Sequence, residues 1–129
     1  MSSRPLLQPM IVIGGNSGVS GNMASNITSL VTVISNQSMM SYEYTWSGTS
    51  PIGVVSVQVS NDYSQNADGT VNNPGNWSTL PLSATPAVTG NTGTGFIDID
   101  SLAGYAIRTI YTATSGTGTM TATYKGKVQ

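Results

Sequence analysis

Two aspartates in the stretch FIDID have a spacing that could support catalysis. Asp98 and Asp100 share one side of a strand, because side chains two positions apart point the same way. Paired carboxylates serve as acid and base in glycoside hydrolysis. The chain has no histidine and no cysteine, which removes the common neutral-pH base, the thiolate nucleophile and the usual zinc ligands. We therefore expect Asp98 and Asp100 to have a structural role, and we expect no enzymatic activity and no cofactor.

The polar segment NDYSQNADGTVNNPGN, residues 61–76, resembles a calcium-binding loop in part. Its residues near the spacing of calcium ligands are Ser64, Asn66, Asp68, Gly69 and Thr70. The pattern fails at both ends, since Ser64 replaces the first aspartate and Gly75 replaces the terminal bidentate glutamate. We expect a surface turn held by Asn and Asp side chains, and no metal site.

Arg108 stands in the middle of an apolar strand-like run, YAIRTIYTA. A guanidinium keeps its charge in a protein, so it needs a partner or water. Only a short connection separates Arg108 from Asp98 and Asp100. The sequence therefore predicts a structural ion pair between Arg108 and one of these two aspartates, with Glu43 as the alternative partner.

The composition is poor in charge. Charged residues make up 7% of the 129 residues, and the formal net charge is −1. Four basic residues are too few to neutralise a nucleic-acid backbone or to hold an anionic membrane surface. Low net charge also does little to keep copies of a protein apart. We expect a homo-oligomer, with no nucleic acid and no membrane as partner.

Runs of Val, Ile, Thr and Tyr between turn residues predict about eight strands. The predicted strands are Met10–Ile13, Ile27–Ser35, Met40–Trp46, Ile52–Ser60, Trp77–Leu82, Gly95–Asp98, Tyr105–Ala113 and Thr117–Lys125. The last two form a hairpin around SGTG, and the only helical candidate is one turn at Ser101–Gly104. Alternation places Val55 and Val57 on one face, and Met120 and Tyr124 on one face. The predicted fold is all-β, a single-domain antiparallel β-sandwich or jelly-roll-like barrel.

Residues 1–25 are predicted to be an extended N-terminal arm, and residues 26–129 to be the β-sandwich domain. The arm holds an apolar patch of six residues: Leu6, Leu7, Met10, Ile11, Val12 and Ile13. A Gly/Ser/Asn-rich stretch without any period follows it. We expect this assembly arm to lie across a neighbouring subunit, and a disordered tail is the alternative. Prolines interrupt the apolar run, so no signal peptide is expected.

Several short motifs occur together between Trp46 and Lys127. They are WSG before PIG, a strand ending in SND, NW before a leucine, YxxRxxY, and SGTG closing on KGK. With these motifs the chain resembles small virion proteins of bacteriophages. The resemblance implies a non-enzymatic structural protein at the particle surface: a capsid decoration, minor capsid or tail-associated protein. Its implied partners are copies of itself and other virion proteins such as the major capsid protein.

A different class of function stays open. A carbohydrate- or receptor-binding β-sandwich module of a tail fibre or adhesin would use aromatic side chains as stacking platforms. Trp46, Trp77 and the tyrosines are the candidates for that role.

Overall fold

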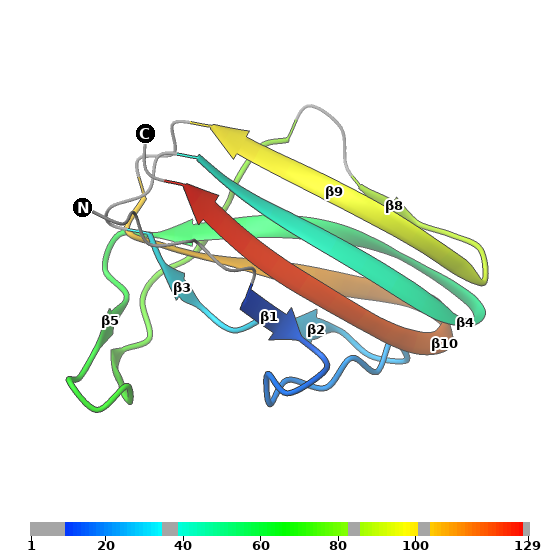
Figure 1. Ribbon diagram of the computed structural model, residues 1–129, viewed down its shortest axis with the longest axis horizontal. Coiled ribbons are helices and arrows are strands. Elements are labelled where there is room, and N and C mark those ends of the chain that lie inside the picture. Colours follow the sequence, from blue (N-terminus) through cyan, green and yellow to red (C-terminus); the bar gives the residue numbers. More distant parts are fainter. Residues whose placement is uncertain (1–9, 35–38, 83–85, 101–103, 128–129) are drawn as a thin grey trace, which may run out of the picture.

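The computed structural model describes residues 10–34, 39–82, 86–100 and 104–127, and these residues form ten strands and no helix (Figure 1). Eight strands form one large antiparallel sheet, and the other two pair with each other. The strands are β1 (Met10–Ile13), β2 (Ile27–Thr28), β3 (Thr32–Val33), β4 (Met39–Ser60), β5 (Ser64–Gln65), β6 (Val71–Asn73), β7 (Ser78–Thr79), β8 (Ala87–Val88), β9 (Thr92–Asp100) and β10 (Ala106–Lys127). The predicted all-β class is confirmed.

Two strands of 22 residues each, β4 and β10, form the centre of the large sheet. They pair antiparallel along their whole length, from Met39 opposite Lys127 to Ser60 opposite Ala106. The strands β1, β2 and β3 follow one another along the other side of β10. In the same way β9, β8 and β7 line the other side of β4. The large sheet is therefore four strands wide, with β10 and β4 in the middle and the shorter strands at its two edges.

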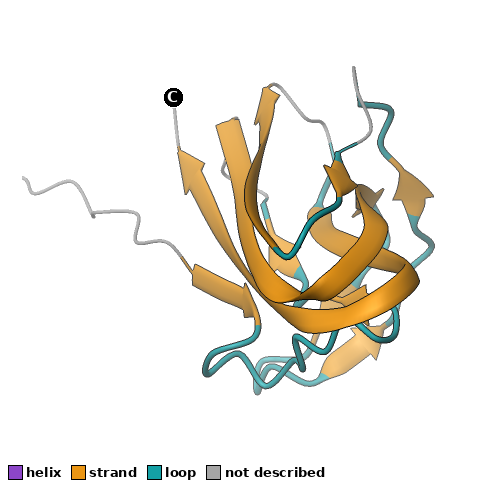
Figure 2. Ribbon diagram, turned by 90° about the vertical axis from the view of Figure 1, so that its right-hand side faces the viewer, coloured by secondary structure: helices purple, strands orange, loops and turns teal. Residues whose placement is uncertain are grey.

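The large sheet bends over on itself near its middle. Even-numbered residues are buried from Met40 to Trp46, whereas odd-numbered residues are buried from Pro51 to Val57. The change occurs where the register of β10 shifts, between Ala113 and Thr117. Register shifts of this kind leave residues unpaired, and such residues bend a strand and let it turn a corner. Figure 2 shows the two long strands curling over, so that the two halves of the sheet face each other.

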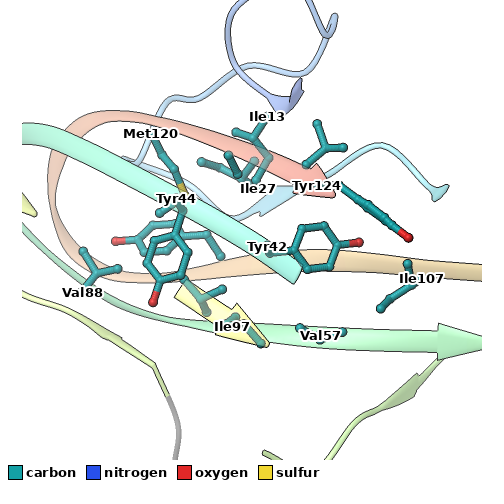
Figure 3. Close-up of a cluster of buried hydrophobic side chains, with 14 of the residues drawn as sticks. Ile13, Ile27, Tyr42, Tyr44, Val57, Val88, Ile97, Ile107, Met120 and Tyr124 are labelled. Atoms are coloured by element: carbon teal, nitrogen blue, oxygen red, sulfur yellow. The ribbon is translucent and has the colours of Figure 1, made fainter. Parts of the chain in front are cut away.

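The core lies between these two halves (Figure 3). Aromatic side chains of β4 occupy its first half. The Tyr42 ring meets the Tyr124 ring edge-on at 5.5 Å, and the Tyr44 ring stacks on Trp46 at 5.9 Å. Aliphatic residues such as Val57 and Ile107 come from the second half. The predicted inward faces of Val55, Val57, Met120 and Tyr124 are confirmed.

The predicted C-terminal hairpin is wrong. Residues 114–118, which include SGTG, lie inside the continuous strand β10 at the bend of the sheet. The glycines serve the bend instead, since Gly116 has a φ of 82° and packs against the Ser50 carbonyl of β4. Likewise, the two strands predicted at Met40–Trp46 and Ile52–Ser60 are one strand. The predicted turn Ser101–Gly104 lies mostly outside the described residues.

The predicted arm is corrected for residues 10–25. Met10–Ile13 is a strand of the chain's own sheet and pairs with β10, and Val12 and Ile13 are 0% and 1% exposed. Met23 is also fully buried. These apolar side chains are buried in the core of the same chain, and β1 pairs with one edge of β10. Leu6 and Leu7 lie outside the described residues.

Candidate functional site

The outer surface of the first half of the sheet is rich in hydroxyl groups. We call it the threonine face, and it comprises Ser41, Glu43, Thr45 and Ser47 of β4, Thr92, Thr94, Phe96 and Asp98 of β9, and Thr119, Thr121, Thr123 and Lys125 of β10. The register sets these side chains in rows across three strands, for example Thr121, Thr45 and Thr94. Strand alternation explains the face, since the residues between them fill the core. Phe96 is 61% exposed in the middle of β9.

Asp98 and Asp100 share the outer side of β9, as predicted, and both are exposed. Asp98 lies opposite Ser41, which has Lys125 on its other side. A surface hollow of about 420 Å³ is lined by Met39, Met40, Ser41, Phe96, Asp98 and Lys125. The two carboxylates therefore stand at an open sheet margin rather than in an enclosed cleft.

Arg108 has different partners from those predicted. Its Nε donates a hydrogen bond to Gln58 Oε1 at 2.8 Å, and its guanidinium carbon lies 4.2 Å from the centre of the Trp77 ring. Partial burial lowers the pKa of the guanidinium below its usual value, which leaves it charged. Trp77 is itself held, since its indole N–H donates to the Pro74 carbonyl at 2.8 Å. Tyr63 packs against the indole with ring centres 5.8 Å apart.

The predicted ion pair is wrong: within the described residues, no ion pair joins Arg108 to Asp98, Asp100 or Glu43. The bend of the sheet is the physical reason. Arg108 lies opposite Gln58 in the second half, whereas Asp98 lies opposite Ser41 in the first half. Arg108 and Asp98 are therefore close in the sequence but lie in different halves of the sheet.

Asp62 is a carboxylate that the sequence analysis did not single out. It accepts hydrogen bonds from the Asn76 backbone N–H at 2.8 Å, the Asn76 amide at 2.7 Å and the Ser60 hydroxyl at 2.9 Å. These bonds, the Asn76 backbone N–H first, lower the pKa of Asp62. An open depression of about 480 Å³ beside it is lined by Val59, Ser60, Asn61, Asp62, Asn76, Ser78 and Gly104. Asp62 and Asn76 are 14 positions apart along this loop, and no pattern in the sequence indicated that they would meet.

The segment with partial calcium-loop spacing forms the β5–β6 turn. Asp68 Oδ1 accepts the Thr70 hydroxyl at 2.7 Å and the Thr70 N–H at 3.0 Å, and the Asn66 amide donates to Thr70 Oγ1 at 3.0 Å. Gly69 adopts a φ of 89° at the tip. This is the predicted turn network. No group of three His, Cys, Asp or Glu side chains suited to a metal ion occurs in the described ranges.

The sequence matches no protein-family model and no curated protein. Among the residues with described structure, no helix has the length and apolar character that a membrane crossing needs. The surfaces of the molecule are therefore the basis for assigning a function.

Proposed function

We propose that this chain is a non-enzymatic structural protein of a bacteriophage particle, either a capsid decoration protein or a minor capsid protein. It acts through contacts with copies of itself and with other virion proteins such as the major capsid protein. The threonine face is the observation that carries this proposal. It is an exposed surface of hydroxyl groups on three adjacent strands with a single exposed aromatic side chain, Phe96.

The chemistry of the threonine face suits protein contacts. Neutral hydroxyl groups make hydrogen bonds across an interface without the cost of burying a charge. Interface cores are depleted in charged residues and enriched in aromatic ones. Eight of the twelve members of the threonine face carry hydroxyl groups and Phe96 is aromatic, whereas Glu43, Asp98 and Lys125 are charged. The motifs by which the chain resembles bacteriophage virion proteins support the same assignment.

The finer fold belongs to this proposal. We regard the bent sheet as a jelly-roll-like β-sandwich, because the resemblance implies a β-sandwich and the strand pattern predicts a sandwich or a jelly-roll-like barrel. The switch from even-numbered to odd-numbered buried residues in β4 supports two layers around one core. The shift in β10 register at the same level supports a corner shared by both long strands.

Labelling of virus particles tests the proposal. An antiserum raised against the recombinant chain is applied to purified particles from the host that carries the gene, and the particles are viewed with gold-conjugated second antibody. We expect gold on intact particles, with none on particles treated with pre-immune serum. Absence of the chain from purified particles, checked by mass spectrometry of the same preparation, would overturn the proposal.

The absence of enzymatic activity needs its own test. Particles that carry Asp98→Asn or Asp100→Asn are expected to be labelled by the antiserum as particles with the parent chain are. Polysaccharide and peptidoglycan are the substrates to assay, because paired carboxylates serve glycoside hydrolysis. Hydrolysis by the parent chain that either variant abolishes while remaining folded would contradict a structural role.

A carbohydrate-binding module is the second candidate, and the half-buried Trp77 favours it. An indole beside an arginine, near a depression lined by Asp62 and Asn76, combines a stacking surface with hydrogen-bonding groups. Trp46 does not fit the same role, since it is 8% exposed and stacked on Tyr44. Binding on a glycan array that Trp77→Ala abolishes, and that Trp46→Phe leaves unchanged, would establish this function instead.

A further inference from the structure

The outer edge of β9 is an unusually open strand edge. This nine-residue strand pairs with β4 on one side, and no other described strand pairs with it. Figure 1 shows it at the upper margin of the sheet, beside the first half of β4. Proteins usually protect such edges with proline, charged side chains (lysine above all) or a bulge. The sequence TGTGFIDID has no proline or lysine, its charged residues are Asp98 and Asp100 near one end, and its register with β4 is regular.

The hydrogen-bond pattern shows which residues are available at this edge. The Gly48 N–H donates to the Asn91 carbonyl at 2.7 Å, one step before Ser47 pairs with Thr92. Bonded and non-bonded pairs alternate along an antiparallel ladder. Odd-numbered residues of β9 therefore bond to β4. Even-numbered residues direct their N–H and C=O groups to the open edge, and these are Thr92, Thr94, Phe96, Asp98 and Asp100.

We propose that β9 pairs antiparallel with β9 of a second copy of this chain, about a two-fold axis at Phe96. Of the registers that oppose even-numbered residues, this one pairs all five of them. Phe96 then lies opposite Phe96 of the second copy, and Thr94 lies opposite Asp98 of the second copy. The ladder supplies about ten main-chain hydrogen bonds, which is typical of a whole protein interface.

The side chains of β9 complement themselves in this register. Each aspartate lies opposite a threonine, whose hydroxyl can donate to the carboxylate, so no two like charges are directly opposed. The two Phe96 rings form a cross-strand aromatic pair, which accounts for an aromatic ring that is 61% exposed in one chain.

The inner side of β9 complements itself as well. Ile97 and Ile99 lie opposite Gly95 and Gly93 of the second copy, so a large side chain meets a small one in each pair. The Tyr44 ring covers Gly95 and the Trp46 ring covers Gly93, where a Cβ would collide with either ring. Each isoleucine of the second copy therefore packs beside an aromatic ring of the core. The pairing joins the first halves of two sheets into one continuous sheet.

This interface rests on the proposed function, because it names the contact by which copies of a virion protein assemble. A mixing experiment tests its register, using the absence of native cysteine. The variants Thr94→Cys and Asp98→Cys are purified separately, mixed and mildly oxidised. Residues opposite each other in a bonded pair have Cα atoms about 5.5 Å apart, which a disulfide can span.

We expect a covalent dimer in the mixture and little in either variant alone. In the proposed register, Thr94 and Thr94 of the second copy are four residues apart along the ladder, about 13 Å, which is too far for a disulfide. A mixture that cross-links no more than the single variants would overturn the proposal.

A proline variant tests the same edge without cross-linking. Thr94→Pro removes an N–H that faces the open edge and leaves the ladder with β4 intact, so the monomer should melt as the parent does. Two main-chain bonds per dimer are lost, which should weaken dimerisation by about tenfold or more in mass measurements over a concentration series. Thr94→Ser keeps the N–H and the hydroxyl and should dimerise normally. Equal dimerisation of the proline and serine variants would contradict the edge pairing.

Particle labelling separates this inference from the proposed function. If the antiserum labels particles but the cysteine variants give no cross-link specific to their mixture, the β9 interface is overturned and the virion role is supported. If the cysteine variants cross-link as expected but the chain is absent from particles, the interface is supported and the virion role is overturned.

Discussion

Arg108 is held by a neutral amide and an aromatic ring. Its Nε donates to Gln58 on the neighbouring strand, and its guanidinium group lies over Trp77. A cation over an indole gains about 0.5–1 kcal/mol at a site that water still reaches. The arginine thereby joins β10, β4 and the residue that precedes β7 on the outer surface of one sheet half. Its role is to fasten the segment around Trp77 to the sheet.

We expect Arg108→Met to lower the free energy of unfolding by about 1 kcal/mol, because it removes one hydrogen bond and the cation–ring contact. The free energy of unfolding of Arg108→Lys should lie between those of the parent and of Arg108→Met, since an ammonium keeps the charge and loses the planar donor geometry. Urea unfolding of the three proteins at low and high salt measures this. The loss should be nearly independent of salt. A loss that disappears at high salt, or that Asp98→Asn reproduces, would point to a carboxylate partner.

Two buried tyrosine hydroxyl groups, those of Tyr42 and Tyr111, have no hydrogen-bond partner among the described residues. A buried polar group without a partner costs about 1–3 kcal/mol. Tyr42→Phe and Tyr111→Phe are therefore expected to raise the free energy of unfolding by about 1 kcal/mol each. Tyr63→Phe is the matched control and should lower it, because the Tyr63 hydroxyl accepts a bond from Gln65 at 2.8 Å. Lower stability of the Tyr42 variant would reveal a partner for its hydroxyl.

Tyr42 and Tyr124 make stability depend on alkaline pH. Burial, and then the neighbouring Tyr124 phenol, raise the pKa of Tyr42 above its usual range, and burial raises the pKa of Tyr124 to about 12. In the unfolded chain both lose their protons near pH 10. The unfolded state therefore releases protons first, and stability should be constant below about pH 10 and fall as pH rises toward 12. Urea unfolding at several pH values should show a smaller fall for Tyr42→Phe than for the parent. Equal slopes would contradict the shift at Tyr42.

At the scale of strands, the bend needs backbone conformations that few residues adopt. Ser50 has a φ of 49° and is the one non-glycine residue with positive φ in the described ranges. Gly116 lies across from it with a φ of 82°, and a Cβ there would collide with the Ser50 carbonyl. These two residues permit β4 and β10 to turn the corner together.

Gly116→Ala should lower the free energy of unfolding by more than Gly69→Ala does. Both positions have positive φ, which costs a side chain about 1–2 kcal/mol, but Gly69 has open space around it. The difference between the two variants therefore measures the collision at the bend. Ser50→Gly should be neutral or stabilising, because glycine relieves the strain of a left-handed conformation. Thermal melts of the three variants decide this, and equal losses at Gly116 and Gly69 would mean that the bend relaxes easily.

The N-terminal strand is expected to be essential for folding. A chain that starts at Ala24 loses the buried side chains of Val12, Ile13 and Met23. Burying one such side chain stabilises a protein by about 1.5–3 kcal/mol, and whole domains are stable by about 5–15 kcal/mol. We expect this truncation to give unfolded or insoluble protein, whereas a chain that starts at Met10 should melt cooperatively. Circular dichroism and a thermal melt compare the two. A folded Ala24 chain would show that β1 is dispensable.

Local patterns in the sequence located the long strands, but they merged β2 and β3 into one predicted strand, missed β5, β6 and β8, and predicted the connections poorly. Alternation identified the inward residues Val55, Val57 and Met120, because side-chain period depends on nearest neighbours alone. The same information could not show that β4 and β10 each continue as one strand through their glycine-rich segments, since a Gly at positive φ occurs in a hairpin or a bend equally well. Arg108 was assigned to an aspartate for a related reason: which residues meet across strands depends on register and on the bend. Asp62 and Asn76 meet through loop geometry that no short pattern encodes.

At the scale of the whole molecule, the bent sheet has no natural place to divide. Both long strands run through both halves, and the two halves share one core. Separating the halves would break the bend of β4 and β10 and expose the side chains packed between them. The two halves should therefore unfold together.

The two tryptophans report the two halves separately. Trp46 lies in the core beside Tyr44 in the first half of β4, and its indole N–H donates to the Gly90 carbonyl at 3.1 Å. Trp77 lies beside Arg108, which is opposite Gln58 in the second half. The variants Trp46→Phe and Trp77→Phe each leave one fluorescent reporter. For each variant, urea unfolding followed by fluorescence should coincide with unfolding followed by circular dichroism. A fluorescence midpoint in either variant that precedes its circular dichroism midpoint would show that one half opens alone, and that the continuous strands do not couple the two halves of the sheet.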